Sequence, residues 1–145
     1  MKGNIKRKII VNFTIVIVCL VASQSLAIEF IGGTGDPNDP YQIATAEQLR
    51  AIGDSNIYDK SFILIADIDM DPNLPGNEIV VDSSFIDSFK GILDGNGYSI
   101  SNMVMESYYT GRGGNLPLGL IGYLYKDGIV KNIELRNISI RGVGH

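Results

Sequence analysis

The chain has 145 residues, with 12 basic and 16 acidic side chains, a formal net charge of −4 and an isoelectric point near 4.8. This acidic balance argues against nucleic-acid binding, because phosphates are bound by basic surfaces, and against electrostatic docking on anionic lipid. The length is sufficient for one domain with its own hydrophobic core.

The first 27 residues have the three parts of an export signal. A basic start over residues 2–8 is followed by an apolar run from Ile9 to Val21, and Ser25-Leu26-Ala27 places small residues where a signal peptidase cuts. A membrane-spanning helix needs about 20 apolar residues, so this shorter run favours a cleaved signal peptide, residues 1–27, over a retained anchor. We therefore predict a mature segment, residues 28–145, that is secreted or displayed at the cell surface.

Loss of the signal changes the chemistry of the chain. Four basic residues leave with it, so 8 basic and 16 acidic residues remain and the mature net charge is −8. Cys19, the only cysteine, also leaves, so stability must come from a regular hydrogen-bonded core without disulfides. A cation, a neutral glycan or another protein is a compatible partner, whereas nucleic acid and stable membrane insertion are not expected.

The clearest helix is predicted over residues 45–53. Thr45 is a good N-cap, and Gln48, three residues later, completes a capping box. Leu49 and Ile52 share one face of this helix. Because two helical turns are not stable alone, we expect the apolar face to lie on another part of the protein.

A strand is predicted over residues 61–71, which begin as an apolar run and end in alternation. Side chains of a strand alternate between two faces, so one set points to the core and the other to solvent. The inward set is Leu64, Ala66, Ile68 and Met70, and the outward set is Asp67, Asp69 and Asp71.

Further short strands are predicted in the second half of the chain. Two of them flank a turn at Asp94-Gly95-Asn96-Gly97, and others lie within residues 118–125 and 129–135. Many short strands with one helix favour an all-β class over a sheet built from alternating strands and helices.

An internal echo accompanies these strands. The pattern of Ile100–Met105 recurs over Val130–Leu135, with an offset of 30 residues between Asn102 and Asn132. Periods of 20–50 residues are typical of solenoids and propellers, and Asn tolerates the left-handed backbone that a sharp corner between short strands requires.

The strongest candidate site is the acidic segment Asp67-x-Asp69-x-Asp71-x-Asn73, with Glu78 eleven residues after Asp67. The spacing of oxygen ligands is similar to that of a twelve-residue calcium loop. Pro72 stands where such a loop has glycine, and no helices flank it. The segment is therefore interpreted either as a metal site at Asp67, Asp69 and Asp71, with calcium as the ion, or as the solvated acidic face of a strand.

Four blocks, in this order and spacing, resemble the N-terminal part of bacterial surface proteins that carry the GLUG motif. They are Gly35–Leu49, Phe62–Met70, Phe89–Asn102, and Gly119-Leu120-Ile121-Gly122 followed by Val130–Ile133. The resemblance implies a right-handed parallel β-helix of the pectin-lyase-like type, with two to three coils and a small N-terminal capping helix. It also implies an adhesin-like protein of the cell surface.

Two departures from that family matter. This chain has one GLUG tetrapeptide where the family has many, and it stops at Arg141–His145, where a further repeat is due. We therefore expect a segment that is incomplete at its C-terminus, or one whose open C-terminal coil pairs with further repeats or with a partner.

The resulting hypothesis is an exported structural or adhesion-type β-helix module without its own catalysis and without a cofactor. The alternatives are a fragment of a carbohydrate-active β-helix enzyme, a polysaccharide lyase or hydrolase, and a calcium- or glycan-binding module. An enzyme could use the same three aspartates with Lys90 or Arg112 as the cation, although the spacing does not select them. Tyr108, Tyr109, Tyr123 and Tyr125 could form an aromatic platform for a glycan or could cover the core.

Overall fold

The structure is a computed structural model that describes residues 28–54, 56–108 and 117–142. Strands dominate these ranges, and the one named helix, α2, spans Ala46–Ala51. The strands are β1 Tyr41–Ile43, β2 Ser61–Leu64, β3 Ile68–Asp69, β4 Val80–Val81, β5 Ile86–Phe89, β6 Ile92–Asp94, β7 Ser99–Ser101, β8 Val104–Ser107, β9 Ile121–Leu124, β10 Ile129–Lys131, β11 Glu134–Arg136 and β12 Ser139–Gly142. The predicted all-β class is confirmed.

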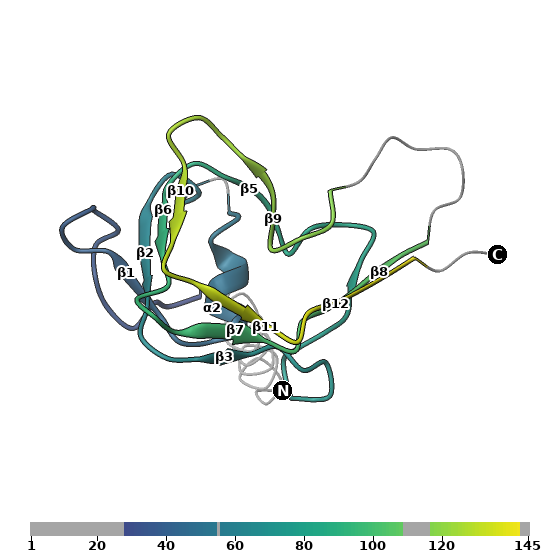
Figure 1. The fold of residues 1–145 in the computed structure, drawn as a ribbon. Coiled ribbons are helices and arrows are strands. Elements are labelled where there is room, and N and C mark those ends of the chain that lie inside the picture. Colours follow the sequence, from purple (N-terminus) through teal and green to yellow (C-terminus); the bar gives the residue numbers. More distant parts are fainter. Residues whose placement is uncertain (1–27, 55, 109–116, 143–145) are drawn as a thin grey trace, which may run out of the picture.

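The named strands form four parallel sheets, and the chain visits these sheets in the same order on each pass. Their strand orders are β1-β2-β6-β10, β3-β7-β11, β4-β8-β12 and β5-β9. Strands of successive passes therefore lie one above another, and the chain turns between sheets at corners rather than by hairpins (Figure 1). Every strand pair is parallel, and in the four-stranded sheet Phe62 pairs with Leu93, 31 residues later, which pairs with Val130, 37 residues further on.

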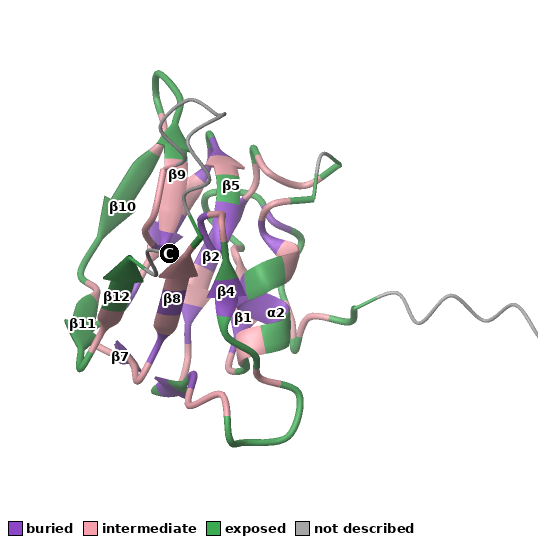
Figure 2. Ribbon diagram, turned by 90° about the vertical axis from the view of Figure 1, so that its right-hand side faces the viewer, coloured by how far each residue is buried: buried purple, intermediate pink, exposed green. Residues whose placement is uncertain are grey.

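The core is a set of aligned apolar columns between these sheets. One column contains Phe62 and Leu93, and another contains Ile68 and Ile100, all of them almost fully buried. Figure 2 shows buried strand residues in the middle of the molecule and exposed strands at one end. Burial is therefore set by position in the stack, because an apolar residue is covered only when strands lie on both sides of it.

The predicted helix is confirmed: α2 spans Ala46–Ala51, with Thr45 as its N-cap and Ile52 as its C-cap. The Thr45 side chain accepts a hydrogen bond from the Gln48 amide at 3.2 Å, as an N-cap should. The Gln48 side chain closes the box one residue earlier than expected, since its Oε1 accepts from Ala44 N at 2.9 Å. Leu49 and Ile52 are fully buried. Figure 2 places α2 on the opposite side of the molecule from β10, β11 and β12.

The prediction of one strand over residues 61–71 is wrong. The segment forms β2 and β3, which belong to different sheets and are separated by a corner at residues 65–67. The inward positions Leu64, Ile68 and Met70 are buried nevertheless. Ala66, predicted to point inward, lies in the corner and is only half-buried. The corner has three residues, so the inward positions Leu64 and Ile68 on its two sides still fit one alternating pattern, which therefore does not reveal the bend.

The 30-residue offset of the sequence echo is not the register of the strands. Ile100 lies beside Leu135, 35 residues later, rather than beside Val130. The difference comes from the spacing of the last pass, where Val130, Leu135 and Ile140 follow one another at five-residue intervals. One strand plus one corner therefore gives a local repeat of five residues. The echo aligns Ile100 with Val130, which lies one strand before its partner Leu135.

The predicted signal peptide, residues 1–27, lies outside the described residues. Within the ranges that are described, none of the helices combines the length and the apolar character needed to cross a bilayer.

Candidate functional site

The three aspartates of the predicted metal site lie in successive parts of the chain: Asp67 in the corner before β3, Asp69 at the end of β3, and Asp71 in the loop that follows. Each accepts hydrogen bonds from different donors. Asp67 Oδ1 accepts from the backbone and the hydroxyl of Ser99, at 2.7 and 2.9 Å. Asp69 Oδ1 accepts from Asp71 N and Asn102 Nδ2, at 3.0 and 2.9 Å. Asp71 Oδ1 accepts from the amide and side chain of Asn73.

In these contacts the three carboxylates hold the nearby backbone in place, since each accepts a hydrogen bond from a backbone amide. Among the described residues, no three His, Cys, Asp or Glu side chains form a group suited to a metal ion. A cation at Asp67, Asp69 and Asp71 would therefore compete with the donors that these carboxylates already have. The calcium site stays a prediction, and calorimetric titration with calcium checks it.

The same hydrogen bonds explain the acidity of these side chains. The backbone and hydroxyl of Ser99 lower the pKa of Asp67, and the Asn102 side chain lowers the pKa of Asp69. Asp94 has a lowered pKa as well, first because it accepts from the Asn96 amide. In each case a donor stabilises the charged form of the carboxylate.

Polar side chains at the corners form two ladders that run along the stack. In one, Asn102 donates to Asp69 at 2.9 Å, and Asn137 donates to Asn102 at 2.6 Å. In the other, Asn132 donates to Asp94 at 3.0 Å. Each of these three asparagines has a positive φ, between 51° and 60°. Asn is suited to this place because it adopts the left-handed region and bridges its neighbours.

Sequence reasoning identified Asn102 and Asn132 as corner residues but missed the ladders. Asn137 follows Arg136 just as Asn132 follows Lys131, and this repeated pair of a basic residue and Asn is the signal that could have revealed them. The bonded partners in the ladders are 33 to 38 residues apart in the chain, so only the stacking of passes brings them together.

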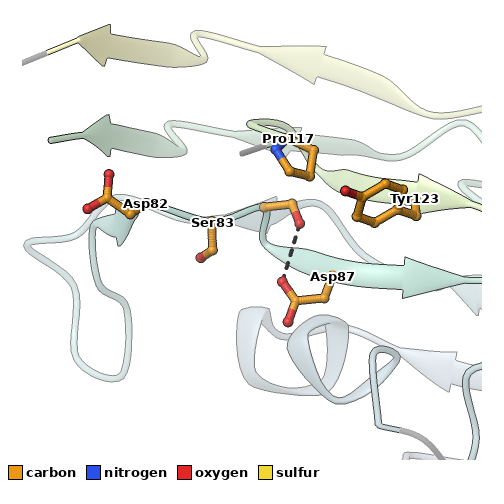
Figure 3. A pocket seen from close by; sticks show the side chains of 6 residues that line it. Asp82, Ser83, Asp87, Pro117 and Tyr123 are labelled. Carbon is orange, nitrogen blue, oxygen red and sulfur yellow. Dashed lines mark hydrogen bonds between the residues drawn. The ribbon is translucent and has the colours of Figure 1, made fainter. Parts of the chain in front are cut away.

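A shallow pocket of about 330 Å³ lies beside β5 and β9, and it is lined by Asp82, Ser83, Ser84, Asp87, Pro117 and Tyr123 (Figure 3). The Ser84 hydroxyl donates to Asp87 Oδ1 at 3.4 Å. The Tyr123 ring is well exposed. An exposed ring beside carboxylate and hydroxyl oxygens has the composition of a small sugar-binding site.

The predicted tyrosine platform is only partly assembled. Tyr123 lines the pocket, whereas Tyr125 packs edge-on to Tyr58, with 6.4 Å between ring centroids. The Tyr108 hydroxyl donates to Glu106 at 2.9 Å on another sheet. Tyr109 and Arg112 lie outside the described residues. Lys90 follows β5 and is exposed.

The structure explains why the second glycine of Gly119-Leu120-Ile121-Gly122 is required. A Cβ atom at Gly122 would lie 2.4 Å from Ser84 Oγ and 2.8 Å from Asp87 O. Glycine at this position therefore allows β9 to approach β5 closely, next to the pocket.

The largest departure from a closed fold is at the end of the stack formed by β10, β11 and β12, which we call the open end. Its inward residues Val130, Leu135 and Ile140 are 38%, 49% and 53% exposed. Their partners in the preceding pass, Leu93, Ile100 and Met105, are all fully buried. The open end therefore has the side-chain pattern of a core layer but lacks a covering strand within the described residues.

Comparisons with known proteins give two relatives. The chain is 30% identical over 140 residues to a protein of Evansella cellulosilytica described as a Gly-rich membrane protein, a match that covers 92% of this chain and 15% of that protein. It is 34% identical over 119 residues to Halomucin of Haloquadratum walsbyi, covering 76% of this chain and 1% of that protein. The chain thus spans a small part of both relatives. No family model matches it, and no solved structure matches it.

Proposed function

We propose that this protein is an exported structural module of the cell surface, built as a short right-handed parallel β-helix. In this proposal it works through association at its open end and has no catalysis of its own. The observation that carries the proposal is the open end, where apolar residues in register with the buried core are exposed.

Two further observations support a structural role. The polar residues at the corners bond mainly to one another along the stack, as in the ladder from Asp69 through Asn102 to Asn137. The relatives include a protein described as a membrane protein, and both relatives are far longer than this chain. A repetitive module of a long surface protein fits these facts, because a stacked solenoid is extended by adding passes.

The pocket beside Tyr123 favours a second candidate function, the binding of a neutral glycan. Its ring could stack on a sugar face, while the Asp87 carboxylate accepts, and the Ser84 hydroxyl donates or accepts, hydrogen bonds with the sugar hydroxyl groups. This function is compatible with an adhesion role and needs no chemistry at the site.

One experiment separates these functions from the enzyme alternative. The full chain is expressed in a bacterial host, the released protein is sequenced at its N-terminus, and it is incubated with a panel of polysaccharides. We expect release of a chain that begins at Ile28 and no shortened saccharide in the product analysis. Retention of residues 1–27, or the appearance of cleaved or unsaturated products, contradicts the proposal.

Glycan binding is tested in the same panel by affinity electrophoresis. Tyr123→Ala removes the exposed ring and is expected to abolish any retardation of the protein by a polysaccharide in the gel. Tyr125→Ala leaves the pocket intact and is expected to leave this retardation unchanged. Equal effects of the two substitutions would argue against a site at Tyr123.

A further inference from the structure

We propose that the open end docks a second copy of this chain, end to end, about a two-fold axis that passes through the midpoint of β11. β11 of one copy then pairs antiparallel with β11 of the other, and β10 of each copy pairs with β12 of its partner. This inference names the partner of the structural module and rests on the function proposed above.

The two ends of the stack differ in the part of the chain that the structure describes. At the far end the inward residues Ile68, Val80 and Ile86 are at most 5% exposed. α2 lies on that side, where the Arg50 guanidinium stacks on the Phe85 ring at 4.6 Å. A contact between the open end of one copy and the far end of another would have to displace this helix. The open end of a second copy has no such cover within the described residues, so we pair open end with open end.

The backbone of β11 has its unpaired groups at the centre of the strand. The amide of Glu134 donates to Tyr98 O, and the carbonyl of Arg136 accepts from Asn102 N, so these two residues direct their backbone groups to β7. Backbone groups of successive strand residues point to opposite sides. Leu135 therefore directs its N–H and C=O to the open side.

The same holds for the two neighbouring strands. In β10 the amide of Ile129 and the carbonyl of Lys131 bond toward β6, so Val130 faces the open side. In β12 the amide of Ser139 bonds to Met103 O on the β8 side, so Ile140 faces the open side. Within the described residues, each of these strands thus has one central residue whose backbone N–H and C=O are not bonded to another strand.

These central residues are arranged symmetrically. Val130 and Ile140 are each five residues from Leu135, so a two-fold axis at Leu135 puts Val130 of one copy opposite Ile140 of the other. Two facing residues with free backbone groups form an antiparallel pair that exchanges both N–H···O bonds. The corners on the two sides of β11 are each two residues long, residues 132–133 and 137–138, so they also face each other across this axis.

The charges on the open end are also self-complementary under this symmetry. Glu134 lies opposite Arg136 of the second copy, and Arg136 lies opposite its Glu134. Lys131 meets Ser139, and Arg141 meets Ile129, so no two like charges face each other. Opposite charges on facing strand positions are favourable and like charges are not, which gives this register an advantage over a shifted one.

A single cysteine at the axis tests this geometry, because the segment 28–145 contains no cysteine. In Leu135→Cys the two thiols would lie opposite each other, within the Cα separation of about 4.4–6.8 Å that a disulfide accepts. Under mild oxidation we expect a disulfide-linked dimer that forms at least about tenfold faster than in Leu74→Cys, because pairing raises the effective thiol concentration. Leu74 is an exposed loop residue away from the open end.

Off-axis cysteines provide the matched control. Val130→Cys and Ile140→Cys should each remain uncrosslinked alone and should crosslink when the two proteins are mixed. Sedimentation of the reduced wild-type protein should show a reversible dimer. The Leu135→Lys variant should sediment as a monomer and should keep the circular dichroism spectrum of the folded wild type. A monomeric wild type, a Leu135→Cys rate equal to that of Leu74→Cys, or self-crosslinking of the off-axis variants overturns the two-fold docking. None of these results affects export or the polysaccharide assay, so the proposed structural role is judged separately.

Discussion

At the scale of single residues, the corners of this protein depend on side chains that connect one pass of the chain with the next. Asn102 illustrates the principle, because it donates to Asp69 below and accepts from Asn137 above, with a φ of 60°. The residue has a conformational role and a bonding role at the same position, so substitutions can separate the two.

Asn102→Ala is expected to lower the free energy of unfolding by about 2 kcal/mol, from two lost side-chain hydrogen bonds and a left-handed backbone that Ala disfavours. Asn102→Gly should recover the conformational part alone. Urea denaturation measures both, with Asn73→Ala in an exposed turn as a control that should change stability by less than about 1 kcal/mol. Equal losses in Asn102→Ala and Asn73→Ala would contradict a ladder.

The lowered pKa values of Asp67, Asp69 and Asp94 predict a loss of stability in acid. A carboxylate whose pKa is lower in the folded state stabilises that state above its ordinary value of 3.8, and this contribution disappears as the pH falls through the lowered value. Urea melts between pH 7 and pH 2 should therefore show stability that declines below about pH 4.

Asp67→Asn identifies one contributor to this acid response. The variant should be less stable than wild type near neutral pH, because the charged acceptor for Ser99 is lost. The difference should shrink toward low pH, where the aspartate is protonated as well. A difference that is constant with pH would mean that the Asp67 charge does not stabilise the fold.

At the scale of elements, the close approach of consecutive passes restricts which residues fit between strands. A Cβ atom at Gly91, just before β6, would lie 1.8 Å from the carbonyl oxygen of Lys60 in the pass below. The same atom at Gly119 would meet nothing closer than 3.7 Å. The spacing between strands, rather than turn geometry, thus requires glycine at the first position.

Gly91→Ala is therefore expected to destabilise the protein by about 3 kcal/mol, since the strands must separate to admit a methyl group. Gly119→Ala is the matched control and should change the free energy of unfolding by less than about 1 kcal/mol. Thermal and urea unfolding of both variants make the comparison, and a stable Gly91→Ala protein would show that β2 and β6 are less closely stacked.

The short helix α2 depends on Gln48, whose side chain accepts from Ala44 N and donates to Glu29 O, both at 2.9 Å. Gln48→Ala leaves these partly buried backbone groups without a partner and should cost about 2 kcal/mol. Glu47→Ala, at a neighbouring exposed position, should cost less than about 1 kcal/mol. Similar losses in the two variants would argue against Gln48 as a connection between the helix and the N-terminal segment.

At the scale of the whole molecule, the stack has a protected middle and an exposed open end. Strands β6 and β7 are paired on both sides, whereas β10, β11 and β12 are paired on one side. Local opening is easiest where strands have the fewest neighbours. The molecule should therefore be least stable at the surface that we propose for docking.

Hydrogen exchange measures this gradient directly. In dilute solution the amides of β6 and β7 should exchange most slowly and those of β10, β11 and β12 fastest. Raising the protein concentration should slow exchange at Val130, Leu135 and Ile140 selectively, because these residues direct their free amides to the second copy. Uniform protection in dilute solution would contradict the gradient.

Local features of this protein could be predicted from the amino-acid sequence because they depend on near neighbours. The Thr45 cap, the apolar positions Leu64, Ile68 and Met70, and the turn at residues 94–97 follow from capping, alternation and turn chemistry, and the structure confirms them. The break between β2 and β3 could not be predicted, since a corner that preserves alternation has the same pattern as a straight strand.

Only the tertiary structure decided which passes lie beside each other. Asp67 is paired with Ser99, 32 residues away, and Ile100 with Leu135 rather than Val130. Ile100 and Leu135 are alike in sequence terms, yet one is fully buried and the other half exposed. The physical reason is that burial depends on whether another strand lies above a residue, which is a property of the stack and not of the residue.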